Sequence, residues 1–158
     1  MYKRQSENDA AGKITIKADG FYFDAREEVN VYLGNISVHH PDYNLTATKK
    51  LKLYFSKNEQ GEQNISHIIA LGDVFLESFN EQGKYQRAKA ETIEYNLQKE
   101  EIYLINGYPA LEKEGQGTMQ AQKENVWMRL YSDGSLITSP DGAWEIVYTN
   151  LERSKDSQ

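Results

Sequence analysis

The sequence predicts an all-β protein, either a sandwich, a barrel or a jelly roll, on three observations. Apolar residues recur two positions apart, which is the spacing of a half-buried strand. The one stretch with helix-forming content, residues 82–98, continues with Ile93, Tyr95 and Leu97 at strand spacing, so we expect a strand there too. Turn signals divide the chain into short segments at Asp19-Gly20, His40-Pro41-Asp42, 58–61, 80–83, Gly115-Gln116-Gly117, Asp133-Gly134 and Pro140-Asp141-Gly142.

Each expected strand is justified by apolar residues at alternate positions. In chain order these are Phe21 and Phe23; Val29, Val31 and Leu33; Ile36 and Val38; Leu51, Leu53 and Phe55; Ile69 and Leu71; Val74 and Leu76; Ile93, Tyr95 and Leu97; Ile102 and Leu104; Tyr108 and Ala110; and Val126, Met128 and Leu130. The tyrosines Tyr22, Tyr32, Tyr54 and Tyr103 alternate against this set, so we expect them on the outward face, where they pack between strands.

Three glycines separate pairs of apolar runs and make the chain a repeat. Gly34, Gly72 and Gly107 lie 38 and 35 residues apart, and the apolar parity slips by one across the first two. Glycine accepts the backbone angles of a bulge or sharp bend without cost, so each glycine predicts such a bend. Alanines alternate with these glycines as a looser marker, at Ala18, Ala47, Ala90 and Ala121. This period predicts stacked units that share one core.

Length and charge limit the classes of protein to which the chain can belong. The 158 residues fit one domain, which we expect over residues 13–151 between polar, flexible tails at 1–12 and 152–158. The net charge of −6 speaks against nucleic acid or an anionic bilayer as the main partner. Because the chain has no cysteine, disulfides and thiolate sites are excluded. No apolar run reaches bilayer length and residues 1–12 are polar, so we expect either a cytoplasmic protein or one whose leader was removed.

Residues that could carry catalysis are poorly arranged. His39 and His40 are adjacent on an expected strand end and should point to opposite faces, while His67 is isolated, so solvated histidines are favoured over a metal site. Ser37 and Ser78 have no nucleophile-elbow context, and no glycine-rich phosphate loop precedes a helix. We therefore expect no enzymatic activity, no metal and no cofactor.

Several motifs in a defined order resemble a known family. They are Leu33-Gly34-Asn35-Ile36-Ser37-Val38, Ala70-Leu71-Gly72-Asp73-Val74-Phe75-Leu76, Ala88-Lys89-Ala90-Glu91-Thr92-Ile93-Glu94-Tyr95 and Ile102-Tyr103-Leu104-Ile105-Asn106-Gly107. Over residues 14–136 the chain resembles the OstA-like (LptA) family of lipopolysaccharide-transport proteins. Two segments depart from the pattern, Gly107-Tyr108-Pro109 and residues 144–151.

The resemblance implies a fold and a function. The fold is an open, slightly twisted antiparallel β jelly roll of two facing sheets, built from repeats. The function is non-enzymatic binding of lipopolysaccharide and its transport across the periplasm to the outer membrane, with the acyl chains of lipid A in an apolar slot between the sheets. The implied partners are similarly folded Lpt components at the inner and outer membranes and further copies joined head to tail. Free strand edges for such joining are expected at 14–23, 126–131 and 144–148.

The resemblance and the apolar parity together predict which side chains line the slot. These are Phe21, Phe23, Val31, Leu33, Ile36, Val38, Leu51, Leu53, Phe55, Ile69, Leu71, Val74, Leu76, Ile93, Tyr95, Ile102 and Leu104. By residue type alone the same set is typical of the closed core of any β-sandwich.

Two alternatives therefore stay open. One is the membrane-anchored, LptC-like component of the same pathway without its membrane helix. The other is a β-sandwich with a sealed interior that binds carbohydrate or a protein surface.

Overall fold

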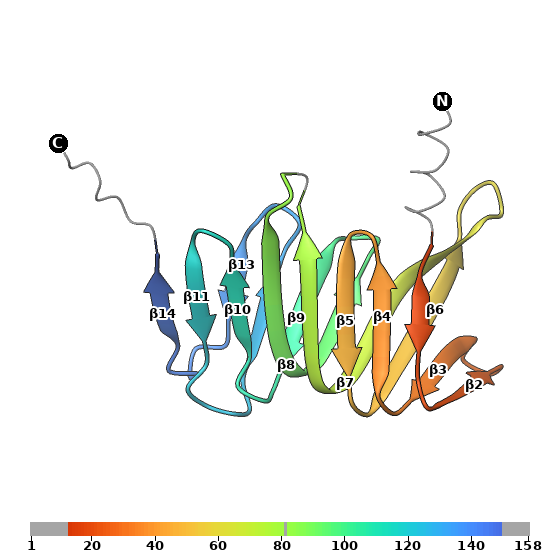
Figure 1. The fold of residues 1–158 in the computed structure, drawn as a ribbon, viewed down its shortest axis with the longest axis horizontal. Helices are drawn as coiled ribbons and strands as arrows, with labels where there is room; N and C mark the ends of the chain where they lie inside the picture. The colour runs from red at the N-terminus through yellow and green to blue at the C-terminus, as the bar shows by residue number, and fades with distance from the viewer. Residues whose placement is uncertain (1–12, 81, 150–158) are drawn as a thin grey trace.

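Fourteen strands and no helix make up the part of the chain that the structure, a computed structural model, describes, namely residues 13–80 and 82–149 (Figure 1). The all-β prediction is confirmed. The strands are β1 (Thr15–Lys17), β2 (Gly20–Asp24), β3 (Val29–Leu33), β4 (Ile36–His40), β5 (Tyr43–Ala47), β6 (Lys50–Lys57), β7 (Gln63–Phe79), β8 (Tyr85–Asn96), β9 (Glu101–Ile105), β10 (Ala110–Lys113), β11 (Gly117–Gln120), β12 (Trp127–Leu130), β13 (Leu136–Thr138) and β14 (Glu145–Tyr148).

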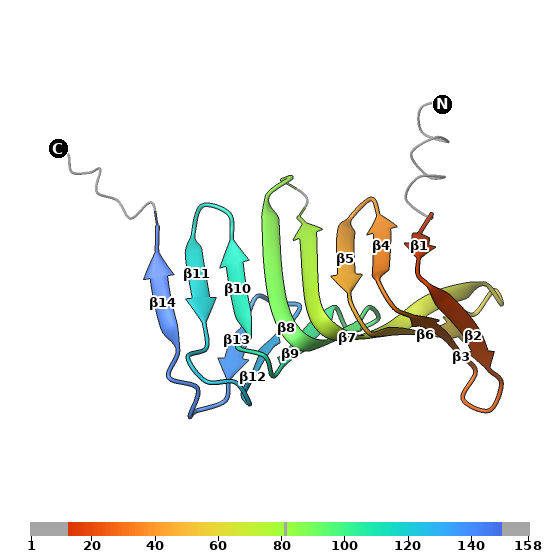
Figure 2. The ribbon, with the colours of Figure 1, turned by 60° about the horizontal axis from the view of Figure 1, so that its bottom comes forward.

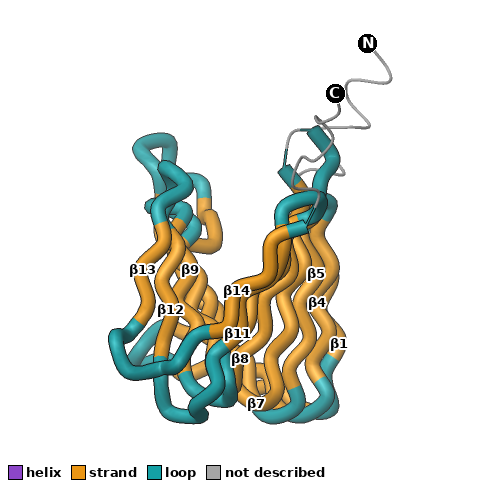
Figure 3. Tube along the Cα trace, turned by 90° about the vertical axis from the view of Figure 1, so that its left-hand side faces the viewer, coloured by secondary structure: helices purple, strands orange, loops and turns teal. Residues whose placement is uncertain are grey.

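The strands form two antiparallel sheets that meet along one corner. The first sheet has the order β1-β4-β5-β7-β8-β10-β11-β14, and the second has the order β2-β3-β6-β7-β8-β9-β12-β13. The long strands β7 and β8 run through both sheets, so hydrogen bonding continues around the corner. Figure 3 shows the V-shaped section that results, and Figure 2 shows the second sheet coming forward beneath the first. We call the ends of the strands that are distant from the corner the open rim. The inner faces are the faces of the two sheets that are directed toward each other. The open β jelly roll implied by the resemblance is confirmed.

The predicted bends at the repeated glycines form this corner. Gly34, Gly72 and Gly107 all have left-handed backbone angles, with φ of 77°, 96° and 72°. Neighbouring strands are hydrogen-bonded there, because the Thr48 N–H donates to the Gly72 carbonyl (2.8 Å) and the Gly34 N–H donates to the Lys49 carbonyl (3.0 Å). The bends of successive strands therefore stack into one continuous line.

The slip in parity expected at Gly72 does not occur in β7, although the partner strand β8 changes parity at the corner, from Ala90 to Ile93. The buried residues of β7 are Ile68, Ala70, Val74 and Leu76, which are all at even positions. Gly72 and the following Asp73, with φ of 43°, both adopt left-handed angles, and the register of β7 with β8 skips this pair. Because two residues of β7 lie in the bend, side chains at even positions point inward on both sides of it. A bulge of one residue would have reversed the direction of the side chains beyond the bend.

Register also decides which face β3 turns inward. Val31 pairs with Tyr22 and Lys52 and so lies on the outer face of the second sheet, although it is only 1% exposed. Tyr32 pairs with Leu51, which belongs to the core between the sheets. The expectation that Tyr32 points outward is therefore wrong. Tyr22, Tyr54 and Tyr103 are on the outer face as expected.

Small side chains lie where the two sheets come together. Ala47 and Ala90 are in the first row of the first sheet beyond the corner, and Ala70 is in the matching row of the second sheet. All three are at most 4% exposed. The space between the sheets is narrowest beside the corner, so a larger side chain would force the sheets apart. This packing accounts for two of the alanines that alternate with the glycines, Ala47 and Ala90, but not for Ala18, which is exposed.

The free edges of the sheets are β1 and β14 in the first and β2 and β13 in the second. The expected edges at 14–23 and 144–148 agree with this arrangement. The expected edge at 126–131 is wrong, because β12 is paired on both sides, with β9 and β13. The turn signals fall between strands as predicted. Asn58 shows why, since its side-chain oxygen accepts the N–H groups of Gln60 and Glu62, both at 2.9 Å.

Candidate functional site

The space between the two sheets is the candidate binding site, and it contains many of the predicted lining residues. Buried there are Ile36, Val38, Leu51, Leu53, Val74, Leu76, Ile93, Ile102 and Leu104, with Phe55 and Tyr95 half-buried against them. Alternating strands from two sheets thus supply one shared aliphatic surface.

Four of the predicted lining residues lie on the other side of the second sheet. Leu33 pairs with Gly20 and Lys50, Ile69 pairs with Lys52 and Glu94, and Leu71 pairs with Lys50 and Thr92. Val31 is on this outer face as well, so the expectation that these four face the slot is wrong. The reason is the register of these strands with their neighbours, which directs the four side chains to the outer face. Phe21 and Phe23 share a face with Tyr32 and Asn30, but they belong to edge strand β2 and are 57% and 56% exposed.

Sequence reasoning missed several residues of this interior. Leu45 is 1% exposed and alternates with Tyr43 and Ala47, so the spacing-by-two signal was present there. Ile68 and Ala70 were hidden, because the run from Ile68 to Leu71 is apolar on both faces. Ala88 and Leu111 of the core were missed as well.

A cavity of about 570 Å³ opens between the sheets at the β1 end of the molecule. Its apolar lining comes from Ile14 and Ile16 on the first sheet and from Leu53, Phe55 and Ile65 on the second, with Tyr32 and Leu97. The polar lining is His40, Tyr43, Gln63 and Asn64. This end lies on the right of Figure 1.

A smaller cavity of about 170 Å³ lies at the opposite, β14 end. Leu111, Met119 and Ile146 of the first sheet and Leu136 of the second provide its apolar walls. Lys113, Gln116 and Tyr148 also line it. The interior is therefore hollow at both ends of its long axis.

Between the two cavities the interior is filled by side chains. Leu45, Ile68 and Leu104 are no more than 1% exposed. Nearer the rim, Tyr43 of the first sheet meets Tyr95 of the second in an edge-to-face contact, with ring centroids 5.8 Å apart. Burial raises the pKa of Tyr43 to about 12, with Tyr95 and Asp42 adding to the shift, as expected for a phenol in an apolar setting. These rings link the two sheets on the open side of the V.

The histidines do not form a ligand set. His39 and His40 lie on opposite faces of β4, as expected. The Nδ1 atom of His39 is 2.6 Å from the side-chain oxygen of Asn44, and the Nδ1 atom of His40 accepts the Asp42 N–H at 3.0 Å. Over the described part of the chain, no three His, Asp or Glu side chains are grouped so as to hold a metal ion. The same residues include no helix long and apolar enough to cross a membrane.

Comparisons with known proteins agree with this geometry. Residues 15–127 match the sequence model of a family described as "LptA/(LptD N-terminal domain) LPS transport protein". Among solved structures, the chain is similar to LptH from Pseudomonas aeruginosa, described as the LptA homologous periplasmic component of the conserved lipopolysaccharide transport device. The TM-score is 0.66 at 19% identity, over 88% of this chain and 96% of that one. No curated protein matches the chain.

Proposed function

Because the chain belongs to the family of LptA and LptD N-terminal-domain lipopolysaccharide transport proteins, we propose that it is a periplasmic bridge component that carries lipopolysaccharide toward the outer membrane. The acyl chains of lipid A lie between its two sheets. The observation that carries this proposal is the aliphatic interior of the V, hollow at both ends. Burial of each methylene contributes about 0.8 kcal/mol, so such a surface binds acyl chains without catalytic groups.

Passage of a chain along the molecule requires the sheets to move apart. The middle of the interior is filled, whereas over the residues that the structure describes the two sheets are joined covalently and by hydrogen bonds only along the corner. On the open side they are held by side-chain contacts such as the Tyr43–Tyr95 pair. An acyl chain therefore replaces apolar contacts between the sheets with equivalent contacts to itself.

The free edges suit assembly with similarly folded partners. β1 and β2 end the two sheets at one end of the molecule, and β13 and β14 end them at the other. Unpaired backbone groups on such strands accept a further strand. We therefore assign to these ends the contacts with Lpt components at the inner and outer membranes, and head-to-tail joining of copies. The periplasmic description of LptH supports the same location for this chain.

Photo-crosslinking at inner-face positions tests the proposal. A crosslinking residue at Val74 on the inner face of β7 should capture lipopolysaccharide, as should residues at Ile36 and Leu104. The matched control is Ile69, which lies on the same strand but on the outer face, where no adduct is expected. A β-sandwich with a permanently sealed interior would give no adduct at the three inner positions. That outcome would contradict the proposed function.

A further inference from the structure

The inner face of the first sheet changes from apolar to polar in a single step toward the open rim. One row of directly paired residues is wholly apolar and consists of Leu76, Ala88, Leu111, Met119 and Ile146. The next row toward the rim consists of Ser78, Gln86, Lys113, Gly117 and Tyr148. The second row brings a cation and three hydrogen-bonding side chains to the border of the aliphatic surface.

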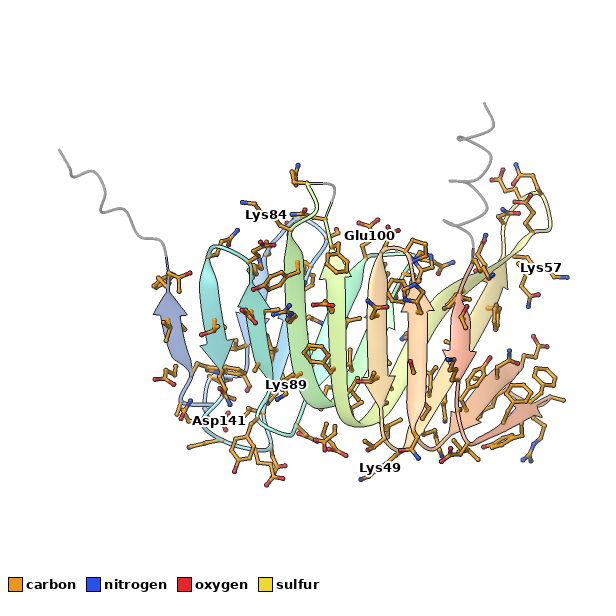
Figure 4. All side chains as sticks on the ribbon, in the orientation of Figure 1. Lys49, Lys57, Lys84, Lys89, Glu100 and Asp141 are labelled. Carbon is orange, nitrogen blue, oxygen red and sulfur yellow. The ribbon has the colours of Figure 1, made fainter. Side chains whose placement is uncertain are left out.

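A polar cavity of about 240 Å³ lies at this border. It is lined by Ser78, Lys84, Gln86, Lys113, Glu114 and Gln116, among others. Lys113 and Gln116 also line the apolar cavity at the β14 end, so the polar and apolar hollows adjoin. Figure 4 shows Lys84 at the rim end of β8. A polar hollow beside an apolar one matches a ligand with a hydrophilic head and a hydrophobic tail.

The charges of this polar cavity are available for a ligand. Within residues 13–80 and 82–149, neither Lys84 nor Lys113 takes part in an ion pair. Glu114 adds one negative charge to the same lining, and its carboxylate accepts the N–H of Tyr85 at 3.0 Å, so the two lysines leave a net positive charge there. Lys113 is half-buried, which lowers the solvent screening of its charge relative to a fully exposed lysine.

We propose that Lys84 and Lys113 bind phosphate on the headgroup of the acylated ligand, whose tail lies on the apolar row below. This inference rests on the proposed function and extends it to the headgroup. The chain carries a net charge of −6, which by itself repels a phosphorylated lipid. Two lysines at the border place positive charge where the headgroup leaves the aliphatic surface. Lysine binds phosphate as a flexible point charge, and Ser78 and Gln86 beside it offer hydrogen bonds.

Equilibrium binding of lipid A with both phosphates, compared with enzymatically dephosphorylated lipid A, tests the inference on the whole chain. Loss of two charge-assisted contacts in a Lys84→Gln, Lys113→Gln double variant should weaken binding of the phosphorylated form about tenfold. Its affinity should also depend less on salt. Binding of the dephosphorylated form should stay within about twofold of the wild type, since the apolar contacts are unchanged. Lys89→Gln is the matched control, because Lys89 is on the outer face of the same strand (Figure 4).

The possible outcomes separate the two proposals. Equal binding of phosphorylated lipid A by the double variant and the wild type would overturn the headgroup site alone. An equal loss for both lipids would also overturn it, because the effect would then not depend on phosphate. Wild-type protein that binds neither lipid would overturn the proposed function and the headgroup site together. The single variants Lys84→Gln and Lys113→Gln, each with an expected loss of about threefold, give the same comparison if the double variant does not fold.

Discussion

Individual residues at the corner decide whether a strand can pass from one sheet to the other. At Gly72 the backbone has a φ of 96°, and an added Cβ would lie 2.5 Å from the Thr48 hydroxyl oxygen and 2.8 Å from the Lys49 backbone nitrogen. The positive φ requires a residue that tolerates left-handed angles, and the short distances from an added Cβ exclude any side chain at all. Asp73, which follows it, is left-handed but exposed, so there a side chain has room.

Gly72→Ala should therefore be far more costly than a glycine substitution in an open turn. We expect it to lower the free energy of unfolding by about 3 kcal/mol, from backbone strain together with overpacking. Gly61→Ala is the matched control, because Gly61 has a φ of 82° with nothing within 4 Å of an added Cβ, so only the strain of about 1 kcal/mol remains. Urea unfolding of both variants measures the difference. Equal losses would show that contacts across the corner do not matter.

At the scale of single elements, the hydrogen-bonding sides of strand β14 determine how the sheet could be extended. The N–H of Thr149 donates to the Gln116 carbonyl at 3.0 Å. Because backbone groups alternate along an antiparallel strand, Glu145 and Val147 also direct theirs toward β11. The N–H groups of Ile146 and Tyr148 therefore point away from the sheet, at its free edge.

Ile146→Pro should accordingly block strand addition and leave the fold in place. It removes a donor from the free edge, where proline is tolerated, so the proposed head-to-tail association should disappear while the melting temperature changes little. Val147→Pro is the control, since it breaks the pairing of β14 with β11 and should destabilise this edge. Sedimentation velocity over a range of concentrations measures the association. If Ile146→Pro associated as the wild type does, joining through this edge would be refuted.

At the scale of the whole molecule, the two sheets behave as arms that share one corner. β7 and β8 belong to both arms, so the two sheets share these strands. The packed middle of the interior and the contact between Tyr43 and Tyr95 hold the two arms together. We expect the proposed entry of an acyl chain to change the distance between the arms rather than the structure within either arm.

Spin labels on the two arms should detect this movement. The chain has no cysteine, so labelled cysteines at Asp42, in the turn between β4 and β5, and Lys99, in the turn between β8 and β9, are the only two. Their separation should increase when lipopolysaccharide binds, because the interior must widen. A pair at Asp42 and Gln82, both on the rim of the first sheet, should not change. An unchanged distance between the arms in lipid-loaded protein would contradict opening of the V.

The sequence by itself determined what depends on neighbouring residues. Alternation gave the all-β class, Asn58 and Asn80 marked hairpin turns through their own side-chain hydrogen bonds, and Gly34, Gly72 and Gly107 marked the bends. These signals are local because backbone angles and turn hydrogen bonds involve residues close in the chain. The predicted lining was correctly placed in the interior at positions such as Val38 and Leu53, where only one face of the strand is apolar.

Only the tertiary structure decided which apolar face is inner and which is outer. Val31 and Ile69 have the same local pattern as Val38 and Val74, but they lie on the outside of the V. Their direction is set by register with strands far away in the chain and by the left-handed residues at each bend, two at Gly34 and Gly72 and three at Gly107. The edge at β13, the cavities at both ends and the border at Lys113 likewise require distant strands to be paired. No spacing within one segment encodes such a pairing, because it is selected by the packing of the whole core.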